Sequence, residues 1–71
     1  MNLREAEEGK TYTVKNVNTD DEELRTFLFT LGCCKGEPIT VILNRKNFCV
    51  VSVKDCRYSI DPVLAKVVEI K

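Results

Sequence analysis

The chain of 71 residues has no histidine and no tryptophan, and only 7% of its residues are aromatic. Without histidine, general acid–base catalysis near neutral pH lacks its usual carrier. Any metal site would have to be built from thiolates and carboxylates alone. We therefore expect a binding protein rather than an enzyme, with no catalytic residues and no cofactor.

An excess of either charge is also missing, because 11 basic and 11 acidic residues give a formal net charge of zero. Nucleic-acid-binding proteins usually carry a clear basic excess, since phosphate contacts supply most of their affinity. We expect no nucleic-acid partner. The basic residues Arg45, Lys46, Lys54 and Arg57 lie in or beside predicted turns, where a solvated loop or an acidic partner explains them.

Long apolar runs are absent as well, since none exceeds four residues. Nothing here is long enough for membrane insertion. The opening segment Met1–Glu8 is too polar and too acidic for a secretory signal. We expect a cytoplasmic protein without stable disulfides, folded as one small domain over residues 1–71 with a thin core.

One segment has the spacing of an amphipathic helix. Its apolar residues recur at i, i+3, i+4 and i+7, which places them on one face. This spacing predicts an α-helix over about residues 20–31. The residues predicted to face inward are Leu24, Phe27, Leu28 and Leu31.

The ends of this helix are marked by capping residues. Thr19 and Asp20 are the predicted N-caps, with a glutamate three residues after each, and Gly32 is the predicted stop. The acidic stretch Asp20–Glu23 could instead bind Fe(II), because carboxylates suit hard divalent ions. Capping and the helix dipole explain the same residues without a metal, and we favour that interpretation.

The rest of the chain reads as short strands joined by tight turns. Residues 44–47 and 54–55 are the predicted hairpin turns, and Asp61-Pro62 predicts one short helical turn over about 61–65. Five short strands in so few residues predict a small, curved, mostly β barrel with one inserted helix. The predicted strands run from Tyr12 to Val17, from Ile39 to Asn44, from Cys49 to Val53, from Cys56 to Ile60 and from Val68 to Ile70.

Four cysteines raise the question of a metal or redox site. Structural zinc favours cysteine pairs separated by two to four residues, and none of the spacings between Cys33, Cys34, Cys49 and Cys56 fits. Strand alternation places Cys49 and Cys56 on inward faces, where free cysteine packs as a small hydrophobe. A cysteine-based zinc, iron or redox module stays the alternative function.

The order and spacing of these elements match a known pattern. Its most specific part is Leu31-Gly32 followed by Gly36, at the end of the predicted helix. The other matching residues are Leu3, Gly9, Val14, Val17, Leu24, Leu28, Ile39, Val41, Val51, Val53, Tyr58, Ile60, Ala65, Val68 and Ile70. In these residues the chain resembles the FeoA family, the small cytosolic proteins of ferrous iron transport. The resemblance implies a five-stranded SH3-like barrel.

The resemblance also implies a function. The family works alongside a membrane Fe(II) transporter that carries a cytosolic GTP-binding domain, and its members are regarded as accessory binding proteins rather than enzymes. We therefore expect this chain to dock on the cytosolic part of such a transporter. The same domain type follows DNA-binding domains in some metal-dependent repressors. This chain has no helix-turn-helix pattern, so we do not expect it to regulate genes directly.

Three positions depart from the family pattern. Asp55 stands where a turn glycine is usual, and aspartate tolerates a positive φ better than most residues. Lys35 stands where proline is common. Cys33 stands where the family has an aliphatic residue, which implies a buried side chain, whereas Cys34 falls at a position that is polar in relatives. We expect Cys34 to be the most exposed thiol.

Exposed apolar residues close to one another often mark an interface. Phe29 lies off the apolar stripe of the predicted helix, and Phe48 alternates outward from Cys49. The alternative is that Phe29 completes a thin core. Exposed strand edges also make self-association into a homo-oligomer possible. The predicted partner contacts are Phe29, Leu31, Cys34, Lys35 and Phe48.

Overall fold

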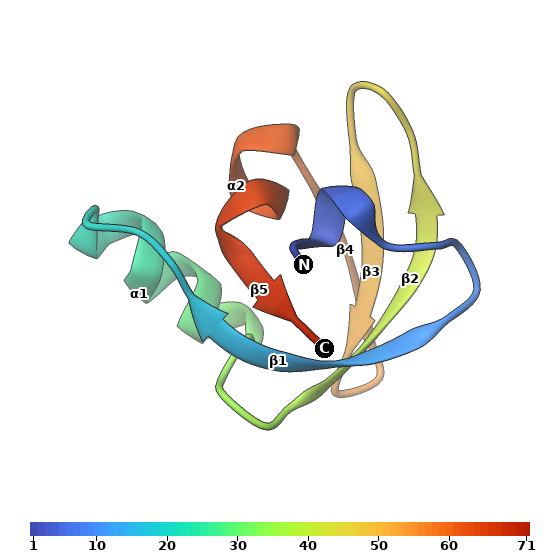
Figure 1. Cartoon of the computed structure of the whole chain (residues 1–71). Helices are drawn as coiled ribbons and strands as arrows, with labels where there is room; N and C mark the ends of the chain where they lie inside the picture. The colour runs from blue at the N-terminus through green and yellow to red at the C-terminus, as the bar shows by residue number, and fades with distance from the viewer.

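Five antiparallel strands form one strongly curved sheet in the order β4-β3-β2-β1-β5 (Figure 1). The computed structural model describes all residues 1–71. The strands are β1 (Thr11–Val17), β2 (Pro38–Asn44), β3 (Cys49–Val53), β4 (Cys56–Ile60) and β5 (Val68–Ile70). Two helices, α1 (Glu22–Leu31) and α2 (Pro62–Val67), and a short 3-10 helix, η1 (Leu3–Glu5), complete the fold. The predicted mostly β architecture with an inserted helix is confirmed.

Helix α1 begins two residues later than predicted. Its N-cap is Asp21, whose carboxylate accepts hydrogen bonds from the backbone N–H groups of Glu23 and Leu24 at 3.0 and 3.2 Å. The prediction of Thr19 and Asp20 as caps is wrong, because only Asp21 brings an acceptor to the free donors of the first turn. Thr19 lies before the cap, and its hydroxyl accepts a hydrogen bond from the Asp21 N–H at 3.1 Å.

The predicted helix stop is confirmed. Gly32 adopts a φ of 101° and donates its N–H to the Phe29 carbonyl at 3.0 Å. A side chain on Gly32 would also lie 3.1 Å from the Val53 methyl group Cγ1. Glycine is therefore needed here both for the left-handed backbone and for the close approach of the β3–β4 hairpin.

The second helix is longer than the predicted turn over 61–65. Asp61 caps α2 by accepting a hydrogen bond from the Leu64 N–H at 2.9 Å, and Pro62 occupies the first helical position. The helix continues to Val67 and passes without a loop into β5. This direct transition lets the last strand return along β1.

The predicted tight turn between β3 and β4 is confirmed. Lys54 and Asp55 have φ values of 51° and 65°, so both take the left-handed conformation that two-residue hairpins require. Val53 and Cys56 flank the turn as directly paired residues. Asp55 thus adopts a conformation for which glycine is the usual choice.

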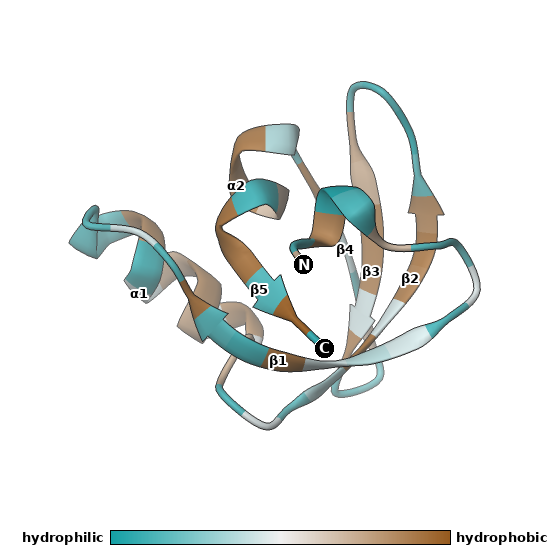
Figure 2. Ribbon diagram, in the orientation of Figure 1, coloured by the Kyte–Doolittle hydropathy of each residue, from teal (hydrophilic) through white to brown (hydrophobic).

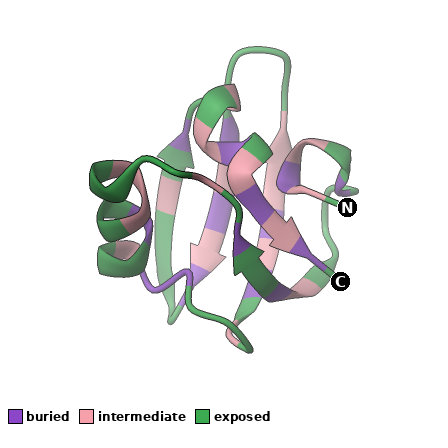
Figure 3. Ribbon diagram, turned by 60° about the vertical axis from the view of Figure 1, so that its left-hand side comes forward, coloured by how far each residue is buried: buried purple, intermediate pink, exposed green.

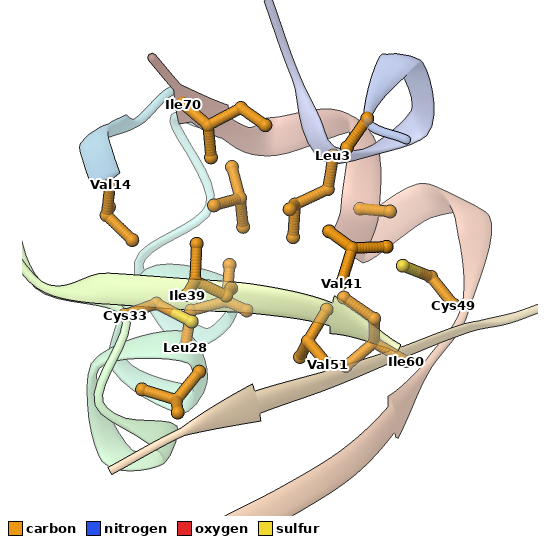
Figure 4. Packing of buried hydrophobic residues seen from close by; sticks show 14 of the residues in the cluster. Leu3, Val14, Leu28, Cys33, Ile39, Val41, Cys49, Val51, Ile60 and Ile70 are labelled. Carbon is orange, nitrogen blue, oxygen red and sulfur yellow. The ribbon is translucent and has the colours of Figure 1, made fainter. Parts of the chain in front are cut away.

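The curved sheet encloses a core of fifteen buried residues (Figure 4). The largest are aliphatic side chains contributed by nearly every element, which include Leu3, Leu28, Ile39, Val41, Val51 and Ile70. One departure from strand alternation occurs in β2, where the register shifts between Val41 and Leu43. Leu43 is consequently half-buried rather than part of the core.

The N-terminal segment forms a clasp that the sequence pattern does not predict. Asn44, at the end of β2, donates its side-chain amide to the carbonyls of Leu3, Arg4 and Ala6 at 3.2, 3.3 and 2.8 Å. These bonds hold η1 against the sheet and keep Leu3 fully buried. Neither α-helix has the length and apolar composition needed to cross a bilayer.

Candidate partner-binding surface

Helix α1 lies to one side of the barrel and leaves most of its surface to solvent (Figures 1 and 3). Leu28 is its only fully buried residue, with an exposed fraction of 0%. Leu24 and Leu31 are half-buried. Figure 2 shows that α1 is hydrophilic at its start and more hydrophobic toward its end. The helix is thus anchored to the core mainly through Leu28.

The two phenylalanines of α1 are both exposed. Phe27 has an exposed fraction of 48%, so the prediction that it faces inward is wrong. Successive helical residues are about 100° apart, so Phe27 lies at the edge of the apolar stripe, and the barrel covers only the stripe's centre at Leu28. Phe29, on the other side of Leu28, is 47% exposed. The alternative that Phe29 completes the core is therefore wrong.

The structure brings four of the five predicted contact residues together. Phe29 and half-buried Leu31 lie on α1, and the exposed residues Cys34 and Lys35 follow in the loop that leaves it. Phe48, 37% exposed, lies in the β2–β3 hairpin, well away from α1 in both views of the molecule (Figures 1 and 3). Whether any of the five touches a partner stays a prediction.

Two of the three cysteines predicted to be buried are buried. Cys33 is 2% exposed and packs near Ile39 and Leu28, and Cys49 lies in the core at the start of β3 (Figure 4). Burial raises the pKa of the Cys33 thiol to about 11, with a smaller contribution from neighbouring Cys34. Burial also raises the pKa of Cys49. Both thiols are therefore poor nucleophiles.

Cys56 is exposed, so the prediction that it belongs to the core is wrong. It shares the alternation of Tyr58 and Ile60, but Ile60 is the only buried residue of β4, the end strand of the sheet. The core reaches Val53 on β3, directly opposite, and does not cover Cys56. The neighbouring Cys56 thiol is the main cause that raises the pKa of Tyr58. Cys34 is exposed, as predicted, but it shares this property with Cys56.

The structure assembles no ligand set for a metal. No three cysteine, aspartate or glutamate side chains lie close enough to hold an ion. All four cysteines are free thiols, and the surface has no pocket for a small molecule. Asp21, in the acidic stretch considered for Fe(II), serves as the cap of α1. The expectation that the protein binds no cofactor stays a prediction.

Two of the four basic residues near the turns are paired within the protein. Arg45 forms an ion pair with Glu8, and Lys54 Nζ lies 3.1 Å from Glu37 Oε1. Arg4 donates to the Arg45 carbonyl at 2.7 Å, which ties the β2–β3 hairpin to η1. These contacts give Arg45 and Lys54 structural roles within the fold.

Comparison with known structures shows which proteins share this fold. A crystal structure of an iron uptake regulatory protein (FeoA) superimposes with a TM-score of 0.91 at 25% identity, covering 100% of this chain and 95% of that chain. The Stenotrophomonas maltophilia FeoA complexed with zinc gives a TM-score of 0.90 at 22% identity, covering 100% of this chain and 89% of that one. The latter is described as a procaryotic SH3 domain protein, which confirms the SH3-like barrel.

A more distant protein shares the same fold. A manganese-dependent transcriptional repressor superimposes with a TM-score of 0.91 at 15% identity, covering 99% of this chain but 39% of the repressor. The sequence itself matches no curated protein. The family model for the FeoA domain, however, matches residues 1–71, the full length given. The chain belongs to the FeoA family.

Proposed function

We propose that this chain is a cytoplasmic accessory protein of ferrous iron transport that acts by binding another protein and not as an enzyme. Its partner in this proposal is the cytosolic part of a membrane Fe(II) transporter with a GTP-binding domain. Membership of the FeoA family supports a role in ferrous iron transport. The S. maltophilia FeoA is described with a suggested role as a ferrous iron transport activating factor, and this description agrees with an accessory role.

The observation that carries a binding role is the placement of the phenylalanines. The chain contains three, and all three are exposed while the core is built from aliphatic residues, cysteine and alanine. Phenylalanine side chains supply large apolar contact areas, and burying them is strongly favourable. A small domain that leaves every one of them partly exposed has a surface suited to apolar contact with a partner.

Helix α1 is the part of this surface that we assign to the transporter. Phe27 and Phe29 lie on either side of buried Leu28, so a partner can contact one or both without disturbing the helix anchor. Leu31 extends the apolar surface toward the loop with Cys34 and Lys35. Lys35 would add one positive charge at the rim, where charged residues guide association more than they add affinity.

Titration of the labelled protein with the purified cytosolic domain of the transporter tests this assignment. We expect the backbone amide resonances of α1 and of the loop after it to shift. Phe27→Ala or Phe29→Ala should weaken binding by about tenfold or more, since buried aromatic anchors at interfaces contribute roughly 1–4 kcal/mol.

Phe48, which the sequence predicts as a contact, lies outside the α1 surface that we assign here, so Phe48→Ala is the matched control that removes the same side chain from the β2–β3 hairpin. We expect it to leave the affinity close to that of the wild type. Unmoved α1 resonances at saturating partner would overturn the proposal. An equal loss of affinity for all three alanine variants would contradict the assignment of binding to α1 alone.

A further inference from the structure

The two end strands of the sheet, β4 and β5, differ in whether another segment of the chain covers their outer side. The outer side of β5 is covered by the N-terminus, where Asn2 bridges to Glu69 and the Ile70 N–H donates to the Met1 carbonyl at 2.8 Å. No element pairs with the outer side of β4, which ends the sheet. The protein therefore has one bare end strand.

The hydrogen-bonding groups on this edge follow from the β3–β4 turn. Val53 and Cys56 close a two-residue hairpin and so form a hydrogen-bonded pair. The pairing continues without a shift to the end of β4, so the alternation directs the peptide groups of Tyr58 and Ile60 toward β3. The N–H and C=O groups of Arg57 and Ser59 consequently point away from the sheet.

Natural proteins usually protect such an edge with a very short strand, charged residues (lysine above all), proline, a bulge or a covering segment. Strand β4 reads Cys56-Arg57-Tyr58-Ser59-Ile60, contains neither proline nor lysine, and has Arg57 as its one charged residue. Its pairing with β3 shows no bulge. The edge is thus free to accept a further strand.

We propose that β4 pairs antiparallel with β4 of a second copy of this chain, across a two-fold axis at Ser59. The two Ser59 residues then face each other as a hydrogen-bonded pair. In this register Arg57 lies directly opposite Asp61 of the second copy. The two-fold axis generates a second, identical Arg57–Asp61 pair. Both residues are exposed, and Arg57 forms no ion pair within its own chain. Opposite charges placed across strands stabilise pairing.

Charge also separates this register from the nearby ones that match the free backbone groups. An axis at Arg57 would place two guanidinium groups opposite each other, and an axis at Tyr58 would place Asp55 opposite Asp61 of the second copy. Like charges directly opposite are destabilising. An axis at Ile60 would place Arg57 opposite Val63 of α2 and would form no ion pair, so only the axis at Ser59 gives two attractive pairs. Asp61 keeps its role as the cap of α2, since one carboxylate oxygen accepts from Leu64 and the other is free to meet Arg57.

A designed disulfide tests the register directly. Paired residues of this type have Cα atoms about 5.5 Å apart, which suits a disulfide. Ser59→Cys, in a background where the exposed thiols are removed by Cys34→Ser and Cys56→Ser, should form a covalent dimer when an added oxidant removes the two thiol hydrogens. We expect its dimer yield to exceed that of Thr30→Cys by about tenfold or more, because Thr30 is equally exposed but lies on α1 and not on the strand that the axis crosses.

The state of the unmodified protein provides the second measurement. The mass from sedimentation equilibrium should rise from monomer to dimer with concentration. Ser59→Pro should remain monomeric with an unchanged circular dichroism spectrum, because it removes an N–H that points outward and takes no part in the β3–β4 ladder. A wild type that stays monomeric at millimolar concentration, or equal cross-linking of Ser59→Cys and Thr30→Cys, would overturn the proposal. The inference does not depend on the proposed transporter partner.

Discussion

Cys33 and Cys34 are consecutive residues, yet Cys33 is 2% exposed and Cys34 is open to solvent. The chain turns sharply where α1 ends. The Cys33 N–H donates to the Leu28 carbonyl at 3.0 Å, and the Cys34 N–H donates to the Gly32 carbonyl at 2.8 Å. This turn directs one thiol into the core and the next one outward, which gives neighbouring cysteines opposite chemical environments.

Thiol labelling of the native protein should separate the cysteines into two classes. Cys34 and Cys56 should react rapidly with a thiol reagent, because both are exposed. Cys33 and Cys49 should react only when the protein unfolds. Mass spectrometry with and without denaturant counts the modified residues. A single rapidly modified cysteine, or four, would contradict the burial described above.

The buried Cys33 thiol should make stability depend on pH in the alkaline range. Its pKa is about 11 in the folded protein against an ordinary value of 9.0, so between these values the unfolded chain has lost a proton that the folded chain retains. The free energy of unfolding should therefore be fully maintained below about pH 9 and should fall as the pH rises to about 11. Two pKa units correspond to roughly 2–3 kcal/mol.

Cys33→Val tests this effect, because valine fills a similar space without an ionisable group. Denaturant unfolding of both proteins across the pH range gives the difference in their stabilities. That difference should be constant below about pH 9 and then shift in favour of Cys33→Val. Parallel curves up to about pH 11 would rule out Cys33 as the source.

Gly32 should be less tolerant of substitution than Gly36. Both have a positive φ, of 101° and 90°, but a side chain on Gly32 would lie 3.1 Å from the Val53 side chain, whereas nothing lies within 4 Å at Gly36. Gly36→Ala should cost about 1 kcal/mol through backbone strain alone, and Gly32→Ala about 1–2 kcal/mol more. Chemical denaturation measures both variants. Equal losses would show that the close approach to Val53 relaxes without cost.

Leu28 should carry most of the energy that fixes α1 to the barrel. Leu28→Ala removes a fully buried side chain and should lower the free energy of unfolding by about 2–5 kcal/mol. Phe27→Ala removes a larger side chain that is 48% exposed, and we expect a loss below that of Leu28→Ala. Thermal or urea unfolding compares the two. A larger loss for Phe27→Ala would mean that the barrel covers a different face of the helix.

Asn44 should be important for the N-terminal clasp. Asn44→Ala leaves three carbonyl groups, of Leu3, Arg4 and Ala6, without their side-chain donor, and should cost about 1–3 kcal/mol. Asn47→Ala, at an exposed position in the adjacent hairpin, is the matched control and should cost little. Hydrogen exchange of the η1 amides should accelerate only in Asn44→Ala.

The sequence by itself determined the succession of the strands, the two α-helices and the turns, but not η1. Capping and turn residues act over a few positions, so Gly32, Lys54 and Asp55 mark the same breaks in the sequence and in the structure. The alternation of β3 is equally local, and Cys49 is buried as its spacing predicts. The pattern that resembles the FeoA family depends on these same local features, and the match over the whole chain confirms it.

Only the tertiary structure decided how far the core extends along each element. Cys56 has the inward alternation of β4 but lies past the end of the core, and Phe27 has helical spacing but lies beyond the part of α1 that the barrel covers. The periodicity of a sequence indicates in which direction a side chain points. It does not indicate whether a neighbouring element extends far enough to cover that side chain. The separation of Phe48 from α1, the clasp at Asn44 and the bare edge of β4 are long-range relations of the same kind, because each depends on segments that meet only when the sheet curves.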